Sequence, residues 1–370
     1  MIARISFADG YEISRLIKGG WHLAGGHGAV DPEQARKDMA SFVEAGITTF
    51  DCADIYAGVE ELIGSFRRAM PTLARQIQVH TKFVPDLSDL KTLDRRYVEG
   101  IIDRSLRRLG MECLDLVQFH WWDFTVSRYV ETALELDRLR RAGKIARLGV
   151  TNFDTPHLEE LLEAGVPIVA HQLQYSLIDD RADHAMIDCC RAHRIAILCY
   201  GTVCGGFLSE RWLGRPNPGS SLPNRSLIKY QLVIDDFGGW RLFQELLVVL
   251  ARIAALHGTD IASVATRVIL DRPAIAAAIV GATNTSHLHA HAQIDDLRLD
   301  DAELAAIASV TDRRGGPAGD VYVLERDRTG RHGQIMNYEL NSLPIGSARE
   351  DESEDRPTKA GPESQLPPRH

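Results

Sequence analysis

The chain has 370 residues, which allows one large domain or two ordinary ones. Its hydrophobic fraction of 45% and charged fraction of 25% are typical of a soluble globular protein. The formal net charge of −9 argues against nucleic acid or an anionic membrane as a partner.

Cysteine usage and the first residues indicate the compartment. The 6 cysteines include no C-x-x-C pair, which is typical of free thiols in a reducing environment. The start of the chain lacks the long apolar core of a secretory signal. The most apolar helix-like stretch, around residues 246–250, is too short to span a bilayer. We therefore expect a cytoplasmic protein.

Short strand-like runs alternate with longer amphipathic segments along the chain. The strand candidates are Leu16–Trp21, Thr48–Cys52, Gln78–Phe83, Leu114–His120, Ala146–Thr151, Ile168–Leu173, Ile195–Tyr200 and Ala276–Gly281. Helix-like stretches lie near residues 32–45, 59–69, 95–109, 127–142, 155–164, 181–193 and 261–271, and from about 285. This alternation favours a parallel sheet, and eight units predict an α/β fold closed as a (β/α)8 barrel. The main alternative, a doubly wound open sheet, usually carries a Gly-rich fingerprint, but Asp31 stands where its third glycine would follow Gly26 and Gly28.

Three regions depart from the regular alternation. Asp9-Gly10 between alternating residues predicts an N-terminal hairpin over residues 5–13, which would plug the barrel floor. Residues 201–239 predict a long loop after strand seven, and loops of that length are usually functional or mobile. The tail 347–370 is rich in Glu, Asp, Pro and Ser and is expected to be disordered. We therefore predict a single domain over residues 1–346, with a C-terminal extension at 313–346.

Four functional side chains stand at or just after the ends of strand candidates, namely Asp51, Tyr56, Lys82 and His120. Side chains at the carboxyl ends of the strands build the active site of such a barrel. A phenol with an ordinary pKa of about 10 is a slow proton donor, and an adjacent ammonium lowers that pKa. We therefore assign Tyr56 as general acid in carbonyl reduction and general base in alcohol oxidation. Lys82 would tune Tyr56, Asp51 would hold Lys82, and His120 would orient or polarise the carbonyl oxygen.

Each of these residues alone could serve an ordinary structural role, but their surroundings add a family resemblance. Residues 50–56, 80–82, 118–120 and 149–153 resemble, in order, motifs of the aldo-keto reductases, which are NAD(P)-dependent (β/α)8 oxidoreductases. The resemblance covers roughly residues 5–312. It implies an enzyme that interconverts a carbonyl compound and an alcohol.

The resemblance also implies a coenzyme site for NAD(P)H. Asn152 and Gln172 would hold the nicotinamide carboxamide, whose donor and acceptor suit amide side chains. Tyr200 would stack on the nicotinamide ring. The remaining expected coenzyme contacts are Gly20, Trp21, Thr151, Gly201, Gly205, Gly206, Gly281, Ala282, Thr283, His287 and His291.

The adenosine end departs from the family pattern. NADPH-preferring relatives offer Arg or Lys to the 2′-phosphate where this chain has Gly281, Thr283, His287 and His291. A neutral imidazole is a poor substitute for a guanidinium at a phosphate. We therefore expect NADH to be used at least as well as NADPH. His287 and His291 share a helix face, but no nearby carboxylate or cysteine completes a metal site, so we expect no metal.

The substrate and the partners are less specified. Trp21, Trp121 and Trp122 would form an aromatic rim that suits sugar faces and hydrophobic carbonyls alike. A sugar lactol, an aliphatic aldehyde and a steroid ketone all remain open, and no signature indicates an oligomeric state. Two rival functions are a redox-sensing regulatory subunit that keeps the coenzyme, and a metal-dependent barrel hydrolase, for which only His120 would qualify as a ligand.

Overall fold

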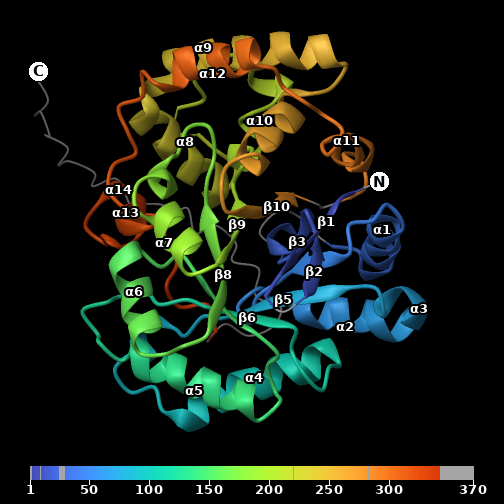
Figure 1. The fold of residues 1–370 in the computed structure, drawn as a ribbon, viewed down its shortest axis with the longest axis vertical. Coiled ribbons are helices and arrows are strands. Elements are labelled where there is room, and N and C mark those ends of the chain that lie inside the picture. The colour runs from blue at the N-terminus through green and yellow to red at the C-terminus, as the bar shows by residue number, and fades with distance from the viewer. Residues whose placement is uncertain (1, 9, 25–29, 220, 282–283, 342–370) are drawn as a thin grey trace, which may run out of the picture.

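The computed structural model describes residues 2–8, 10–24, 30–219, 221–281 and 284–341. Eight parallel strands close a barrel in the order β10-β3-β4-β5-β6-β7-β8-β9 (Figure 1). The strands are β3 (Leu16–Gly19), β4 (Thr49–Asp51), β5 (Gln78–Phe83), β6 (Leu116–Phe119), β7 (Leu148–Thr151), β8 (Ile168–Gln174), β9 (Ala196–Tyr200) and β10 (Ile275–Gly281). The predicted (β/α)8 barrel is therefore confirmed, with each strand inside or within one residue of its expected position.

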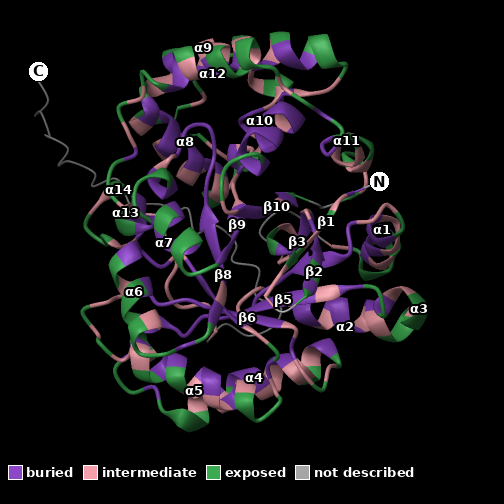
Figure 2. Cartoon of the chain, in the orientation of Figure 1, coloured by how far each residue is buried: buried purple, intermediate pink, exposed green. Residues whose placement is uncertain are grey.

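The register of the strands brings their carboxyl ends to one rim of the barrel. Gly19 pairs with Asp51 across β3 and β4, and Lys82 pairs with Gln118 across β5 and β6. Helices cover the outside of the barrel and side chains fill its interior, so the strands are buried almost throughout (Figure 2). Such two-sided burial explains why their sequences read as continuous apolar runs rather than alternating ones.

An N-terminal hairpin covers the opposite end of the barrel. Strands β1 (Arg4–Phe7) and β2 (Tyr11–Ser14) pair antiparallel. Tyr11 and Ile13 pack in one apolar cluster with inward-facing barrel residues that include Ile17 and Leu116. This confirms the predicted hairpin at the barrel floor, although Asp9 of its turn lies outside the described residues.

Several helices begin where a capping side chain satisfies a free backbone N–H. Asp31, Asp94, Asp154 and Asp260 each accept a hydrogen bond from the first turn of the following helix. The outer helices are α1 (Pro32–Glu44), α2 (Val59–Ala69), α3 (Pro71–Ala74), α4 (Arg95–Leu109), α5 (Tyr129–Arg141), α6 (Thr155–Glu163), α7 (Met186–Ala192), α10 (Ile261–Leu270), α11 (Leu288–Gln293) and α12 (Asp301–Thr311).

The prediction of a long loop over residues 201–239 is wrong for the second half of this segment. Helix α8 (Arg225–Phe237) occupies it, and α9 (Gly239–His257) follows directly. Asn224 caps α8 by accepting from the backbone N–H of Leu227. Apolar residues including Leu227, Ile234 and Phe237 are buried along one face, which provides the packing that a short helix needs.

Residues 319–341, which we call the C-terminal segment, fold back over the carboxyl-end rim. They include the short helices α13 (Val323–Arg326) and α14 (Arg331–Gln334), which lie beside α8 (Figure 1). The backbone N–H groups of Leu340 and Asn341 both donate to Asp86 Oδ1 at 2.8 Å. The tail 347–370, which the sequence predicts to be disordered, lies outside the described residues.

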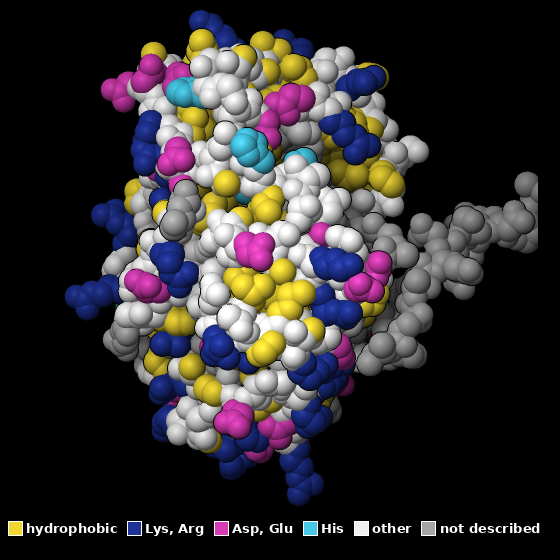
Figure 3. Space-filling model, turned by 90° about the vertical axis from the view of Figure 1, so that its right-hand side faces the viewer, with side chains coloured by type: hydrophobic (Ala, Val, Ile, Leu, Met, Phe, Trp, Pro, Cys, Tyr) yellow, Lys and Arg dark blue, Asp and Glu magenta, His cyan; other side chains and the backbone are white. Residues whose placement is uncertain are grey.

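The described surface mixes charges of both signs. Lysine and arginine side chains are interspersed with aspartate and glutamate over the face shown in Figure 3. In the described ranges, no single helix is both long and apolar enough to cross a membrane. Among the described helices, only α9 and α10 taken together meet that length and composition, and they are bent by 94° with respect to each other.

Candidate active site

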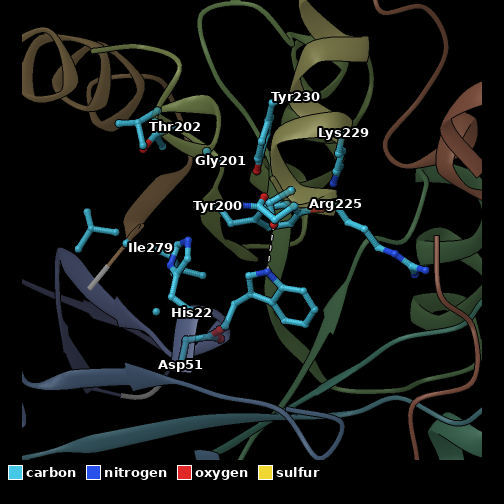
Figure 4. A pocket seen from close by; sticks show the side chains of 18 of the residues that line it. His22, Asp51, Tyr200, Gly201, Thr202, Arg225, Lys229, Tyr230 and Ile279 are labelled. Atoms are coloured by element: carbon cyan, nitrogen blue, oxygen red, sulfur yellow. Dashed lines mark hydrogen bonds between the residues drawn. The ribbon is translucent and has the colours of Figure 1, made fainter. Parts of the chain in front are cut away.

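A cavity of about 1900 Å³ opens at the carboxyl ends of the barrel strands. It is roofed by α8 and the C-terminal segment, and Figure 4 shows Asp51 at its base with Tyr200, Lys229 and Tyr230 above. Most of the predicted site residues line it: Trp21, Asp51, Tyr56, Lys82, His120, Trp122, Thr151, Asn152, Gln172, Tyr200, Gly201, Gly205, Gly206, Gly281, His287 and His291.

Asp51 and Lys82 form a buried ion pair beside Tyr56. Lys82 Nζ donates to Asp51 Oδ2 at 2.7 Å and to the Cys52 carbonyl at 2.8 Å, and it lies 5.0 Å from the centre of the Tyr56 ring. Burial opposes the charge on Lys82, but Asp51 and Tyr56 outweigh burial and raise its pKa to about 12. The ammonium therefore stays charged next to the phenol at neutral pH.

The pKa of Tyr56 is shifted in the direction opposite to the one that the sequence predicts. Burial raises the pKa of Tyr56, and Lys82 opposes this rise without cancelling it. The ammonium favours the phenolate, but the loss of water around the hydroxyl group disfavours it and has the larger effect. Tyr56 is thus protonated at neutral pH, as a proton donor must be.

His120 is neutral and held in one tautomer. Burial, with Arg326 nearby, lowers its pKa to about 3. Its Nδ1 lies 3.1 Å from the Thr151 carbonyl oxygen, which can only accept, so the proton is assigned to Nδ1. This leaves Nε2 as an acceptor, and among the described residues it has no hydrogen-bond partner. A ring in this tautomer accepts from a hydroxyl group and does not donate to a carbonyl.

The two predicted amide residues present complementary groups to the cavity. Asn152 Oδ1 accepts from the Tyr200 hydroxyl at 2.8 Å, and Gln172 Nε2 donates to Asp51 Oδ1 at 2.6 Å. Within the described ranges, the Asn152 amino group and the Gln172 carbonyl oxygen have no partner of their own. One donor and one acceptor therefore remain for a primary amide, so the residues present fit the nicotinamide carboxamide.

The opposite end of the cavity carries carboxylates as well as histidines. Glu210 accepts from the backbone N–H of Ile261 at 2.7 Å, Asp260 caps α10, and both line the cavity. Burial lowers the pKa of His291 to about 4, so this ring is neutral. Ala282 and Thr283 lie outside the described residues. In the described part of the chain, no group of three or more His, Cys, Asp or Glu could hold a metal ion.

Two predicted residues do not reach the cavity. The Trp121 side chain is fully buried and donates from Nε1 to the backbone carbonyls of Asp123 and Val126. Its neighbour Trp122 lines the cavity instead and packs at 4.2 Å, edge to face, against the His120 ring. Gly20 lies where an added Cβ would be 2.6 Å from the Asp51 carbonyl oxygen, so it permits close approach of the backbone rather than contact with a ligand.

Sequence reasoning missed several residues that line the cavity. Arg225, Lys229 and Tyr230 come from α8, and Tyr322, Met336 and Asn337 come from the C-terminal segment. The Tyr322 ring lies 5.6 Å from that of His120, edge to face. The signal for the first group was the spacing of Arg225 and Lys229, which share a helix face four residues apart.

A half-buried phenol beside a buried ammonium at the rim of a (β/α)8 barrel, with amide groups that match nicotinamide, is typical of an NAD(P)-dependent oxidoreductase. The model of the aldo/keto reductase family matches residues 15–312. The chain belongs to this family.

Relatives and solved structures agree with that assignment. The chain is 28% identical over 303 residues to an aldo-keto reductase of Bacillus subtilis named YhdN, covering 78% of this chain and 87% of the relative. It is 24% identical over 314 residues to an NADH-specific methylglyoxal reductase of Escherichia coli, covering 79% and 92%. The crystal structure of an aldo-keto reductase from Klebsiella pneumoniae in complex with NADPH superposes with a TM-score of 0.66 at 21% identity, covering 87% and 100%.

Proposed function

We propose that the protein interconverts an aldehyde or ketone (or a sugar lactol) and an alcohol, with Tyr56 as the general acid and base. The observation that carries this proposal is the buried Asp51–Lys82 pair at 2.7 Å, with its ammonium 5.0 Å from the Tyr56 ring. In reduction, the Tyr56 hydroxyl gives its proton to the carbonyl oxygen. In oxidation, the phenolate accepts the alcohol proton, and Lys82 stabilises that phenolate.

Asn152 and Gln172 would hold the nicotinamide carboxamide, and Tyr200, fixed by its bond to Asn152, would cover the ring. When bound, the coenzyme supplies or takes the hydride. His120, as an acceptor at Nε2, would position a hydroxyl group of the substrate or of the alcohol product. Trp21 and Trp122 form walls of this cavity and help to exclude water from it.

We further propose that NADH is bound at least as well as NADPH. Glu210 and Asp260 bring negative charge to the adenosine end of the cavity, and His291 is neutral there. Among the described lining residues at this end, Arg211 supplies a guanidinium. A 2′-phosphate adds about −1.5 to −2 charges and is disfavoured near two carboxylates. One relative is named NADH-specific and one similar structure holds NADPH, so the coenzyme itself has to be measured.

Titration of the purified protein with each coenzyme, followed by tryptophan fluorescence, tests this proposal. We expect saturable quenching with a Kd for NADH no larger than that for NADPH. Tighter binding of NADPH by tenfold or more would contradict the coenzyme assignment. Binding of either coenzyme without turnover of any carbonyl, together with slow coenzyme release, would instead favour the redox-sensing regulatory subunit.

A further inference from the structure

The ammonium of Lys229 is held at the cavity wall without a hydrogen bond among the described residues. Its side chain is 13% exposed and lines the cavity. Three tyrosine rings surround Nζ, with centres at 5.1 Å (Tyr200), 5.7 Å (Tyr230) and 5.5 Å (Tyr322). Aromatic faces attract a cation but do not accept its three N–H donors in hydrogen bonds as oxygen atoms do.

The nearest carboxylate does not neutralise Lys229 fully. Glu325 Oε1 lies 3.9 Å from Nζ, but both oxygens of Glu325 already accept from Arg181, at 2.8 and 3.0 Å. Arg181 also binds Asp179 through two hydrogen bonds. Arg181 thus occupies carboxylate oxygens of both Asp179 and Glu325, which leaves the Lys229 ammonium without a carboxylate oxygen at hydrogen-bond distance.

A second cation lies on the same face of α8. Arg225 stands one helical turn before Lys229, is exposed, and lines the cavity. In Figure 4 both side chains lie on one side of Tyr200, whereas His22 and Ile279 lie on the other. The Tyr322 ring lies close to both Lys229 and His120: its centre is 5.5 Å from the ammonium nitrogen and 5.6 Å from the centre of the imidazole ring. The two cations therefore face the reacting end of the cavity and the C-terminal segment.

We propose that Lys229, assisted by Arg225, binds an anionic oxygen group of the substrate, so that the preferred substrate is a carbonyl compound that also carries a carboxylate or a phosphate. This inference rests on the proposed function and specifies its substrate class. An anion here supplies the charged hydrogen-bond acceptors that the Lys229 ammonium lacks. Lys229 is then a specificity residue, whereas Tyr56 performs the proton transfer with every substrate.

Pairs of aldehydes that differ in one anionic group test this proposal. The carboxylate arm compares succinic semialdehyde with butanal, and the phosphate arm compares glyceraldehyde 3-phosphate with glyceraldehyde. For the wild type we expect kcat/KM to favour the anionic member of at least one pair by about tenfold or more, mainly through KM. Lys229→Met should abolish this preference, Lys229→Arg should keep part of it, and Arg225→Gln, at an exposed position, should reduce it without affecting folding.

A matched substitution away from the cavity distinguishes anion binding at Lys229 from a general effect of lost positive charge. Arg241→Gln, at an exposed position of α9, should leave the ratios unchanged, because Arg241 does not line the cavity. Equal kcat/KM within both pairs would overturn the inference while leaving the proposed function intact. If Lys229→Met instead weakens coenzyme binding and leaves the ratios unchanged, the cation serves a coenzyme phosphate, and the inference is wrong.

A binding measurement does not depend on turnover. Calorimetry of the coenzyme-loaded protein with succinate and with methyl phosphate should detect saturable binding of at least one probe, lost in Lys229→Met. Absence of binding of both probes to the wild type would contradict the inference even if no aldehyde is reduced.

Discussion

At the scale of single residues, the site depends on how burial and charge compete at Tyr56. Burial raises the pKa of the phenol, and the Lys82 ammonium opposes that rise. A protonated phenol suits reduction at neutral pH, because the reaction then needs a proton at the carbonyl oxygen. Oxidation needs the phenolate, whose population grows as the pH approaches the pKa of Tyr56.

The two reaction directions should therefore depend differently on pH. We expect kcat/KM for alcohol oxidation to rise through the alkaline range, while kcat/KM for reduction stays level from about pH 6 to 8. Lys82→Met removes the group that lowers the pKa, so the alkaline limb should move to higher pH and neutral-pH oxidation should slow by about tenfold or more. Steady-state pH profiles of the wild type and the variant measure this. An unshifted limb in Lys82→Met would show that Lys82 does not tune the phenol.

The neighbouring tryptophans show what a sequence can reveal about side chains. Asp51, Lys82 and His120 were predictable because each polar residue stands at or next to the carboxyl end of an apolar strand, and that end must lie at the rim. Trp121 and Trp122 are consecutive, and only the backbone direction at the end of β6 decides that the first is buried and the second lines the cavity. The tautomer of His120 depends on a carbonyl 31 residues away and could not be predicted.

At the scale of elements, the C-terminal segment is attached to the barrel by buried charges. Glu325 is fully buried, and Arg181 and Lys229 lower its pKa to about 2 despite the opposing effect of burial. Removing one member of such a cluster leaves the others buried without full compensation, which is more costly than never having had them.

Glu325→Gln should release this segment. We expect a loss of about 3 kcal/mol or more in the free energy of unfolding, because Arg181 and Lys229 lose their shared carboxylate. Hydrogen exchange should quicken in residues 319–341 before it does so in the barrel strands. As a matched control, Glu245→Gln removes an exposed partner of Arg313 and should change little. Equal effects of the two substitutions would contradict the anchoring role.

Elements formed by local patterns were predictable, and those formed by distant packing were not. The eight strands and the hairpin follow from apolar runs and turn residues. Helix α8 was missed because the Gly- and Pro-rich residues 214–223 before it favour a loop, and its apolar face is buried by distant elements that include α9 and α14. Lys229 and Tyr322 meet although they are 93 positions apart in the chain, and no local pattern encodes that contact.

At the scale of the whole molecule, several buried histidines link stability to pH. Burial lowers the pKa of His80, His120 and His171 to about 3 each. Their ordinary value is about 6.5, so between pH 6.5 and 3 the unfolded chain binds more protons than the folded one. Stability is therefore complete above about pH 6.5 and is lost as the pH falls through this range.

Denaturant unfolding at pH 7, 6 and 5 measures this dependence. We expect the free energy of unfolding to fall with pH, each such histidine adding up to about 1.4 kcal/mol per pH unit to the slope. His171→Gln, outside the cavity, should make the slope shallower without changing its sign. A free energy of unfolding that is the same at pH 7 and pH 5 would rule out neutral burial of these rings.

The central claim, that Tyr56 is the proton donor in a coenzyme-dependent reduction, is tested most directly by Tyr56→Phe. Single-turnover reduction of an aldehyde by the NADH-loaded protein would be followed for the wild type and this variant. We predict that the rate falls by about 10²- to 10⁴-fold while coenzyme affinity stays within about twofold. A Tyr56→Phe variant that reduces the aldehyde at the wild-type rate would contradict the role of Tyr56 as the acid.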